Sequence, residues 1–254
     1  MSARSSVDHT LAAQALLAGI AERGADAVGY AYRTGNGPVT IHKQRSGASA
    51  LLEEVVVPRS TTEALIHVRD YTKGHPSVEA NNHPIRHGAV VGVHNGVILN
   101  DDELMDEHGF ERAESEMTVD SEAIFALAAH SHDEARAFER VRGSMATAWM
   151  DERVPDTIYA ARGIGRPLWM GVGDEGVFFA STKRALEIVE AYVRVKLRKR
   201  EVEHGTQLEL RHGRVVQTAR FEPQPFVEED PLPAVRAPRE AEACLNALQS
   251  LAAA

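Results

Sequence analysis

The apolar positions near the start of the chain recur at the three- and four-residue spacing of a helix. Asp8 or Thr10 can cap this helix, and Gly24 can close it. Its apolar stripe consists of Leu11, Ala12, Ala15, Leu16 and Ile20. The chain is therefore expected to open with a helix that packs one face against the core.

Short apolar runs bounded by turn residues predict strands in most of the chain beyond this helix. The predicted strands are Val28–Tyr32, Val39–His42, Ala64–His67, Ala89–His94, Met145–Met150, Thr157–Ala161, Leu168–Val172, Val177–Ala180, Gln207–Leu210 and Val215–Thr218. Further helices are expected at 100–109, from about Asp120, and from a Ser181 cap through Val189. Many strands with helices at the start, middle and end predict an α+β sandwich, with helices outside two packed sheets.

The character of the sequence changes after about residue 220. Five prolines and a cluster of acids between Phe221 and Pro238 predict an extended linker, and a final helix is expected at about Glu240–Leu251. We therefore predict a main domain over 1–220 and a Pro-rich linker with a C-terminal helix over 221–254. This tail either docks a partner or folds back on its own domain.

Composition narrows the classes of partner. The 254 residues carry a formal charge of −9, which disfavours nucleic acid and anionic membranes as partners. No apolar run approaches the ~20 residues that cross a bilayer, and no secretory signal is visible. The single cysteine, Cys244, fits a reducing compartment, so we expect a cytoplasmic protein. No metal-ligand spacing and no phosphate-binding glycine loop stands out, and no cofactor is expected.

Candidate chemistry is concentrated in three neighbouring segments: His67–Gly74, Asn82-His83-Pro84 and His94-Asn95-Gly96. An arginine can fork onto a planar carboxylate, and an Asn-Gly step can supply donors to an oxyanion. Each residue also has an ordinary structural interpretation when taken singly. Arg69 could be a surface ion-pair partner, His94 a core histidine, Asn95-Gly96 a hairpin turn and Asp120 a helix cap.

The order and spacing of these segments resemble the class II glutamine amidotransferases, a family of N-terminal-nucleophile (Ntn) hydrolases. The resemblance runs from about Leu11 to Val216 and implies a four-layer αββα sandwich with two mainly antiparallel sheets. It implies that Arg69, Thr72, His83 and Asp120 bind glutamine or a γ-glutamyl amide. Asn95 and Gly96 are implied as the oxyanion hole, and the pocket is shaped by Arg23, Asp26 and His94.

Two departures from the family pattern stand out. Asp70, Tyr71 and Lys73 replace the family's Trp, Ala and His, so the rim of the pocket should differ. The family's mature chain begins Cys-Gly-Ile, and this cysteine is the nucleophile. Here the sequence begins Met1-Ser2-Ala3-Arg4.

Three explanations of the second departure are open. A Cys-Gly-Ile strand could lie upstream of Met1. The protein could instead be an inactive glutamine-binding module that regulates or scaffolds. Alternatively, Met1 could be removed so that Ser2 acts as the nucleophile, although the Gly-Ile pattern that would place Ser2 is missing. An active domain would release ammonia from glutamine for a separate synthase subunit.

Overall fold

The computed structural model describes residues 6–131, 133–228 and 233–253. Its helices are α1 (His9–Ile20), α2 (Asp101–His108), α3 (Glu122–His130), α4 (Glu134–Phe138), α5 (Lys183–Val193) and α6 (Pro238–Ala253). Its strands are β1 (Ala27–Thr34), β2 (Thr40–Gln44), β3 (Thr61–Arg69), β4 (Ile85–His87), β5 (Val90–Ile98), β6 (Gly143–Asp151), β7 (Thr157–Arg162), β8 (Trp169–Gly173), β9 (Gly176–Ala180), β10 (Arg198–Glu201), β11 (Thr206–Arg211) and β12 (Arg214–Arg220).

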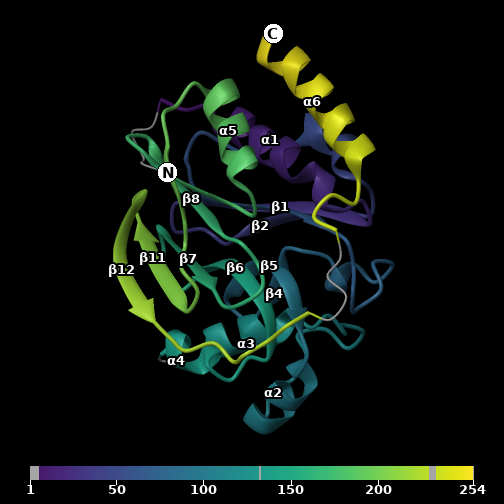
Figure 1. Ribbon diagram of the computed structural model, residues 1–254, viewed down its shortest axis with the longest axis vertical. Coiled ribbons are helices and arrows are strands. Elements are labelled where there is room, and N and C mark those ends of the chain that lie inside the picture. Colours follow the sequence, from purple (N-terminus) through teal and green to yellow (C-terminus); the bar gives the residue numbers. More distant parts are fainter. Residues whose placement is uncertain (1–5, 132, 229–232, 254) are drawn as a thin grey trace.

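The elements form four layers (Figure 1). Helices α1, α5 and α6 cover one side, and α2, α3 and α4 cover the other. The strands between them form a six-stranded antiparallel sheet, β12-β11-β7-β6-β5-β4, and two three-stranded sheets, β2-β1-β3 and β10-β8-β9. The predicted αββα sandwich is confirmed.

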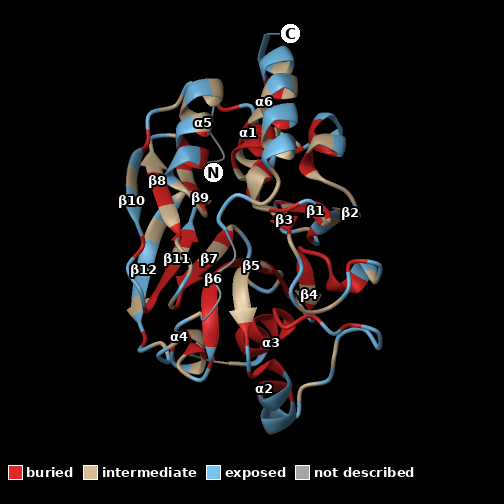
Figure 2. Cartoon of the chain, turned by 45° about the vertical axis from the view of Figure 1, so that its right-hand side comes forward, coloured by how far each residue is buried: buried red, intermediate tan, exposed pale blue. Residues whose placement is uncertain are grey.

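Three apolar cores hold the layers together. One joins α1, α5 and α6 to the two small sheets, one joins the large sheet to α2, α3 and α4, and the third lies between the sheets. Strand β6 is buried along its whole length, as expected of a strand covered on both faces, whereas the edge strand β12 is largely exposed (Figure 2). Burying apolar side chains on both faces of each sheet is what fixes the stacking.

Local signals explain several boundaries. The Asp8 side chain accepts a hydrogen bond from the Leu11 amide at 3.0 Å, which confirms one of the two expected caps of α1. The expected cap of α5 was wrong by one residue: Thr182 accepts from the Ala185 amide, and the helix runs to Val193. The C-terminal helix folds back, and it packs against α1 with Cys244 and Leu248 fully buried.

The layer of small sheets differs from the expectation of two continuous sheets. Strand β3 ends one three-stranded sheet and β9 ends the other, and no described strand joins them. The layer therefore has a break, and β3 and β9 line the same cavity on either side of it. No described helix is long and apolar enough to cross a membrane.

Candidate active site

A cavity of about 240 Å³ lies between the sheets. Most of the expected site residues line it, although they come from five separate segments: Arg23, Arg69, Thr72, His83, His94, Asn95, Gly96 and Asp120. Asp26 does not line the cavity but supports it from behind, and Ser2 lies outside the described residues. The structure thus brings together side chains that the sequence placed up to about a hundred residues apart.

Arg69 ends β3 with its side chain buried in the protein. Its Nη1 donates to Asn82 Oδ1 at 2.7 Å, and its Nη2 donates to the carbonyls of Lys73 at 2.7 Å and Gly74 at 2.5 Å. Burial lowers the pKa of Arg69, while Asp120 and Asp26 act in the opposite direction. A guanidinium remains protonated at neutral pH. Arg69 is therefore a fixed cation, and the surface ion-pair interpretation is wrong.

The Arg23-Gly24-Ala25-Asp26 turn holds the backbone around Arg69. The Asp26 amide donates to the Arg69 carbonyl at 3.0 Å, and Asp26 Oδ2 accepts from the Tyr71 amide at 2.9 Å. A Cβ at Gly24 would lie only 2.5 Å from the Arg69 carbonyl oxygen, so glycine permits the close approach. The turn therefore sets the position from which Arg69 reaches the cavity.

Asn95 and Gly96 lie inside β5, so the hairpin-turn interpretation is wrong. Gly96 has φ +147°, and a Cβ there would lie 1.9 Å from the Ser144 carbonyl oxygen on β6. The Asn95 Nδ2 group is buried and has no hydrogen-bond partner among the described residues. A donor left unpaired at the cavity wall is what an oxyanion hole requires, because a bound oxyanion would satisfy it.

His94 is a scaffold residue. Its Nδ1 contacts Ser121 Oγ at 2.9 Å, and its Nε2 contacts the Ser144 carbonyl at 3.1 Å. Both ring nitrogens are therefore occupied, and burial lowers the pKa of the imidazole. The interpretation of His94 as a satisfied core histidine holds alongside its pocket-shaping role, because the same bonds orient the Asn95-Gly96 step.

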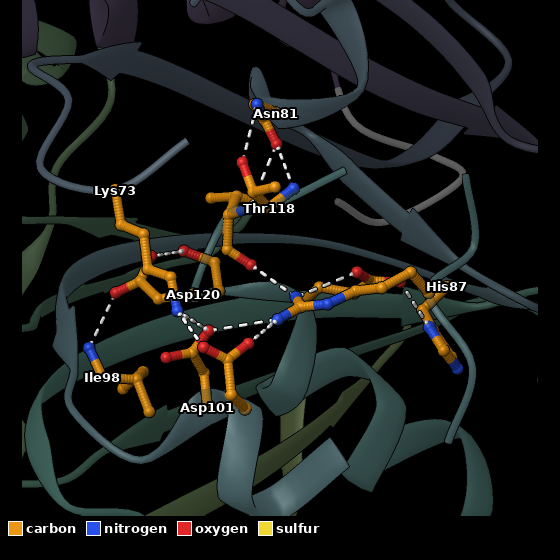
Figure 3. Close-up of polar contacts among 12 residues, drawn as sticks. Lys73, Asn81, His87, Ile98, Asp101, Thr118 and Asp120 are labelled. Carbon is orange, nitrogen blue, oxygen red and sulfur yellow. Dashed lines mark hydrogen bonds and ion pairs between the residues drawn. The ribbon is translucent and has the colours of Figure 1, made fainter. Parts of the chain in front are cut away.

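Asp120 is a buried carboxylate in the cavity wall, and Figure 3 shows it beside Ile98. Its Oδ2 accepts from the Ile98 amide at 2.7 Å, and its Oδ1 accepts from Ser121 Oγ at 3.3 Å. Helix α3 begins at Glu122 with Ser121 at the cap position, so the expectation that Asp120 caps the helix is wrong. Asp120 instead adds a negative charge to a cavity that contains the Arg69 cation.

His83 lines the same cavity as Arg69 and Asp120 and has unpaired ring nitrogens. Both of its ring nitrogens are buried and unbonded among the described residues, and its ring stacks on His67 with centroids 4.3 Å apart. Burial and neighbouring cations hold the pKa of His83 well below its usual range, and burial lowers the pKa of His67 to about 3. Both rings are therefore neutral at pH 7, and His83 can offer one N–H and one lone pair to a ligand.

The rim is more charged than the resemblance implied. Lys73 donates to Asp101 at 2.6 Å and to Asp102 at 2.8 Å, which ties the loop after β3 to α2 (Figure 3). Thr72 is exposed at the same rim. Two lining arginines, Arg166 and Arg236, were missed from the sequence because nothing in their local patterns marks them as pocket residues.

Among the described residues, no group of three or more His, Cys, Asp or Glu side chains is arranged to hold a metal. The polar groups nearest the Arg69 cation and the Asp120 carboxylate are instead amide donors and the neutral imidazoles of His67 and His83. Such a set complements a small zwitterion that also carries an amide or carbonyl group.

Comparison with known proteins identifies a domain within this chain. Residues 67–188 match the family model described as a glutamine amidotransferase domain. The glutamine–fructose-6-phosphate aminotransferase of Shigella flexneri is 34% identical over 174 residues, covering 65% of this chain and 28% of that protein. The Rhizobium meliloti (strain 1021) protein of the same name is 36% identical over 146 residues, covering 54% and 23%. This chain contains a glutamine amidotransferase domain.

Solved structures agree with this amidotransferase assignment at the level of the fold. Glutamine phosphoribosylpyrophosphate amidotransferase from B. subtilis superposes with a TM-score of 0.67 at 20% identity, covering 86% of this chain and 48% of that one. A structure titled as the allosteric regulatory enzyme of purine biosynthesis gives 0.67 at 21% identity, covering 84% and 46%. The amidotransferase domain spans little more than a quarter of the length of the aminotransferases that it matches.

Proposed function

We propose that this amidotransferase domain binds glutamine in the cavity described above. Arg69 would take the α-carboxylate, Asp120 the α-ammonium group, and Asn95 with the Gly96 amide the side-chain carbonyl oxygen. The observation that carries the proposal is the pairing of a fixed cation with a buried carboxylate in one cavity, beside the unsatisfied Asn95 donor. His83 and Thr72 would complete the contacts.

Binding is tested by calorimetric titration of glutamine into the protein and two matched variants. Arg69→Ala removes the proposed carboxylate ligand, whereas Arg59→Ala removes an exposed arginine that does not line the cavity. We expect the first variant to bind at least about 30-fold more weakly, since a charge-assisted pair contributes about 2 kcal/mol. Unchanged affinity in Arg69→Ala would show that the pocket assignment is wrong.

Hydrolysis of the bound amide additionally requires a nucleophile. Cys244 is unsuitable because it is buried in α6, where burial raises the pKa of its thiol to about 12. Among the described residues, no cysteine lines the cavity. The break between β3 and β9 supports another source, because an extended segment entering there would pair with both strands.

We therefore propose that a segment outside the described residues supplies the nucleophile at this break. The Ser6 amide donates to Glu175 Oε2 at 2.9 Å, next to the start of β9, so the first described residue lies at one end of the break. A cysteine there could attack the side-chain carbonyl, release ammonia and form a thioester that water hydrolyses to glutamate.

The second candidate is an inactive domain that binds glutamine without turnover, and the absence of a cysteine among the cavity-lining described residues favours it. Two measurements separate the candidates. Intact-mass analysis of the protein from its own source shows whether residues precede Met1, and an ammonia-release assay shows turnover. An N-terminal cysteine with glutamate formation supports the enzyme, whereas binding without turnover supports the inactive module. A separate ammonia-accepting synthase would be needed only in the first case.

A further inference from the structure

The C-terminal segment 233–237 reaches the mouth of the glutamine pocket. The amides of Arg236 and Ala237 donate to the Glu22 carbonyl at 2.8 and 3.0 Å, and Arg23 Nη1 donates to the Ala234 carbonyl at 2.8 Å. The Arg236 side chain lines the cavity itself. In Figure 1 the chain leaves β12 beside α4, and α6 lies at the opposite end of the molecule. The segment is thus bonded to the same turn that positions Arg69.

The helix that follows anchors this segment to the body of the domain. Cys244 and Leu248 are fully buried against the α1 layer, and Glu240 Oε2 accepts from the Ser49 amide at 2.8 Å. A Cβ at Gly47 would lie 2.2 Å from the Glu240 carboxyl group, so the body is shaped to receive this helix. Residues 233–237 are therefore held from both sides, by the Glu22 carbonyl and by α6.

Arg236 pairs with Asp70, one of the residues in which the rim departs from the family pattern. Their side chains are 17% and 31% exposed, so the pair is partly withdrawn from water and is stronger than an ordinary surface pair. Asp70 directly follows Arg69 in the sequence. The ion pair therefore lies at the side of the pocket that would receive the α-carboxylate.

A second contact fixes the tail before it reaches the mouth. Arg166, another lining residue, forks onto Glu228 with distances of 2.7 and 2.8 Å. Burial and the positive charges of Arg236 and Arg166 lower the pKa of Arg23. Three arginines therefore approach one another at the mouth: Arg23 and Arg166 each bond to the tail, and Arg236 of the tail bonds to Asp70.

We propose that Arg236 is a specificity-determining residue of the glutamine pocket. This proposal rests on the function proposed above. The Asp70–Arg236 pair closes the mouth beside the α-carboxylate position. The pocket accordingly selects the free amino acid. It rejects a glutamine whose carboxyl group continues into a peptide bond, because that ligand has lost the anionic group and extends into the closed mouth.

Calorimetric titrations with glutamine and with the dipeptide glutaminyl-glycine test this selection. In the unmodified protein we expect glutamine binding and at least about a hundredfold preference over the dipeptide. Arg236→Ala should weaken glutamine binding about tenfold and reduce the preference to less than about tenfold. Arg239→Ala is the matched control, because Arg239 is exposed on α6 and does not line the cavity.

A double-mutant cycle with Asp70→Ala assigns the effect to the ion pair. The double variant should bind glutamine no more weakly than either single variant, because each single substitution already removes the same contact. If Arg236→Ala does not fold, Arg236→Gln takes its place in the titrations, because glutamine keeps most of the side-chain length without the charge. Unchanged affinity and unchanged preference in the Arg236 variants would overturn the inference.

Amide hydrogen exchange without ligand keeps the inference testable if the unmodified protein fails to bind glutamine, which would refute the proposed function alone. In Arg236→Ala the Tyr71 amide, which is bonded to Asp26, should exchange at least about tenfold faster because the rim is released. The same exchange rate as in the unmodified protein would show that Arg236 does not hold the rim.

Discussion

The two ends of the cavity differ in how their polar groups are satisfied. At the ligand end, Arg69, His94 and Asp120 are each held by two or more hydrogen bonds from neighbouring residues. At the other end, both carboxyl oxygens of Glu63 are buried without a hydrogen-bond partner among the described residues.

The difference separates a preorganised site from an incomplete one. Fixed polar groups at the ligand end can bind without reorganisation, which is the condition for specific recognition. Unpaired buried groups cost stability, and those on β3 lie at the break in the sheet layer. The unpaired groups at the ligand end, Asn95 Nδ2 and the His83 ring, are ones that bound glutamine could satisfy, whereas the Glu63 carboxyl group has no such partner in the proposed complex.

The largest effect is expected from Gly96→Ala at the ligand end. The new Cβ would lie 1.9 Å from the Ser144 carbonyl oxygen at φ +147°, so β5 and β6 must move apart. We expect a loss of more than about 3 kcal/mol in the free energy of unfolding, measured by urea denaturation. Gly88→Ala is the control, because Gly88 has φ +56° but an open Cβ position, and it should lose only about 1 kcal/mol.

Glu63→Gln tests the incomplete end. Burial raises the pKa of Glu63 to about 7, so the folded state holds a proton that the unfolded state releases between pH 4.5 and 7. Relative to Glu63→Gln, the unmodified protein should accordingly lose about 3 kcal/mol of folding stability as the pH rises through this window.

Denaturation midpoints at pH 5 and 8 measure this effect. The stability difference between the unmodified protein and Glu63→Gln should change between these two pH values, whereas the difference from Glu54→Gln, which changes an exposed carboxylate, should stay constant. An equal pH dependence in the Glu63→Gln protein would mean that this carboxylate is not the source.

Asp120→Asn should weaken ligand binding with little loss of fold. The asparagine side-chain oxygen can still accept from the Ile98 amide, but the negative charge is gone. We expect glutamine affinity to fall about 30-fold, equivalent to about 2 kcal/mol, and stability to change by less than about 1 kcal/mol. Asp106→Asn, an exposed residue of α2, should leave the affinity unchanged. If Asp120→Asn bound glutamine as tightly as the unmodified protein, Asp120 would not be a glutamine ligand.

The smallest effect concerns the stacked imidazoles. The pKa values of His67 and His83 are lowered by burial, so both stay neutral when folded but take up protons when unfolded below about pH 6.5. Each should contribute a stability loss of about 1 kcal/mol per pH unit below pH 6. Urea midpoints at pH 7.5 and 5.5 should therefore differ less in His83→Asn than in the unmodified protein, and an equal difference would contradict the assignment.

Much of the fold could be predicted because its signals are local. Alternating apolar runs indicated most strands, and Asp8 marked the start of α1. The three-residue strand β4 was missed because so short a segment has almost no periodicity. The cap of α5 was placed one residue early because Ser181 and Thr182 are both good caps and only the backbone conformation selects between them.

The site was predictable only where residues lie close in sequence. Arg69 and Asn95-Gly96 could be recognised from their neighbours, and the structure places them in one cavity. The Asn95-Gly96 step alone had suggested a hairpin turn, because its pairing with β6 is a long-range property. Arg236 reaches Asp70 across 166 positions, and no local pattern could have indicated that contact.

A crystal structure of the protein soaked with glutamine is the most direct test of whether glutamine binds in this cavity through Arg69 and Asp120. We expect the α-carboxylate of glutamine to lie within about 3 Å of the Arg69 guanidinium and its α-ammonium group within about 3 Å of an Asp120 oxygen. The side-chain carbonyl oxygen should point at Asn95 Nδ2 and the Gly96 amide. Glutamine bound elsewhere, or bound in this cavity without contacting Arg69 and Asp120, would show that these residues do not form the glutamine site.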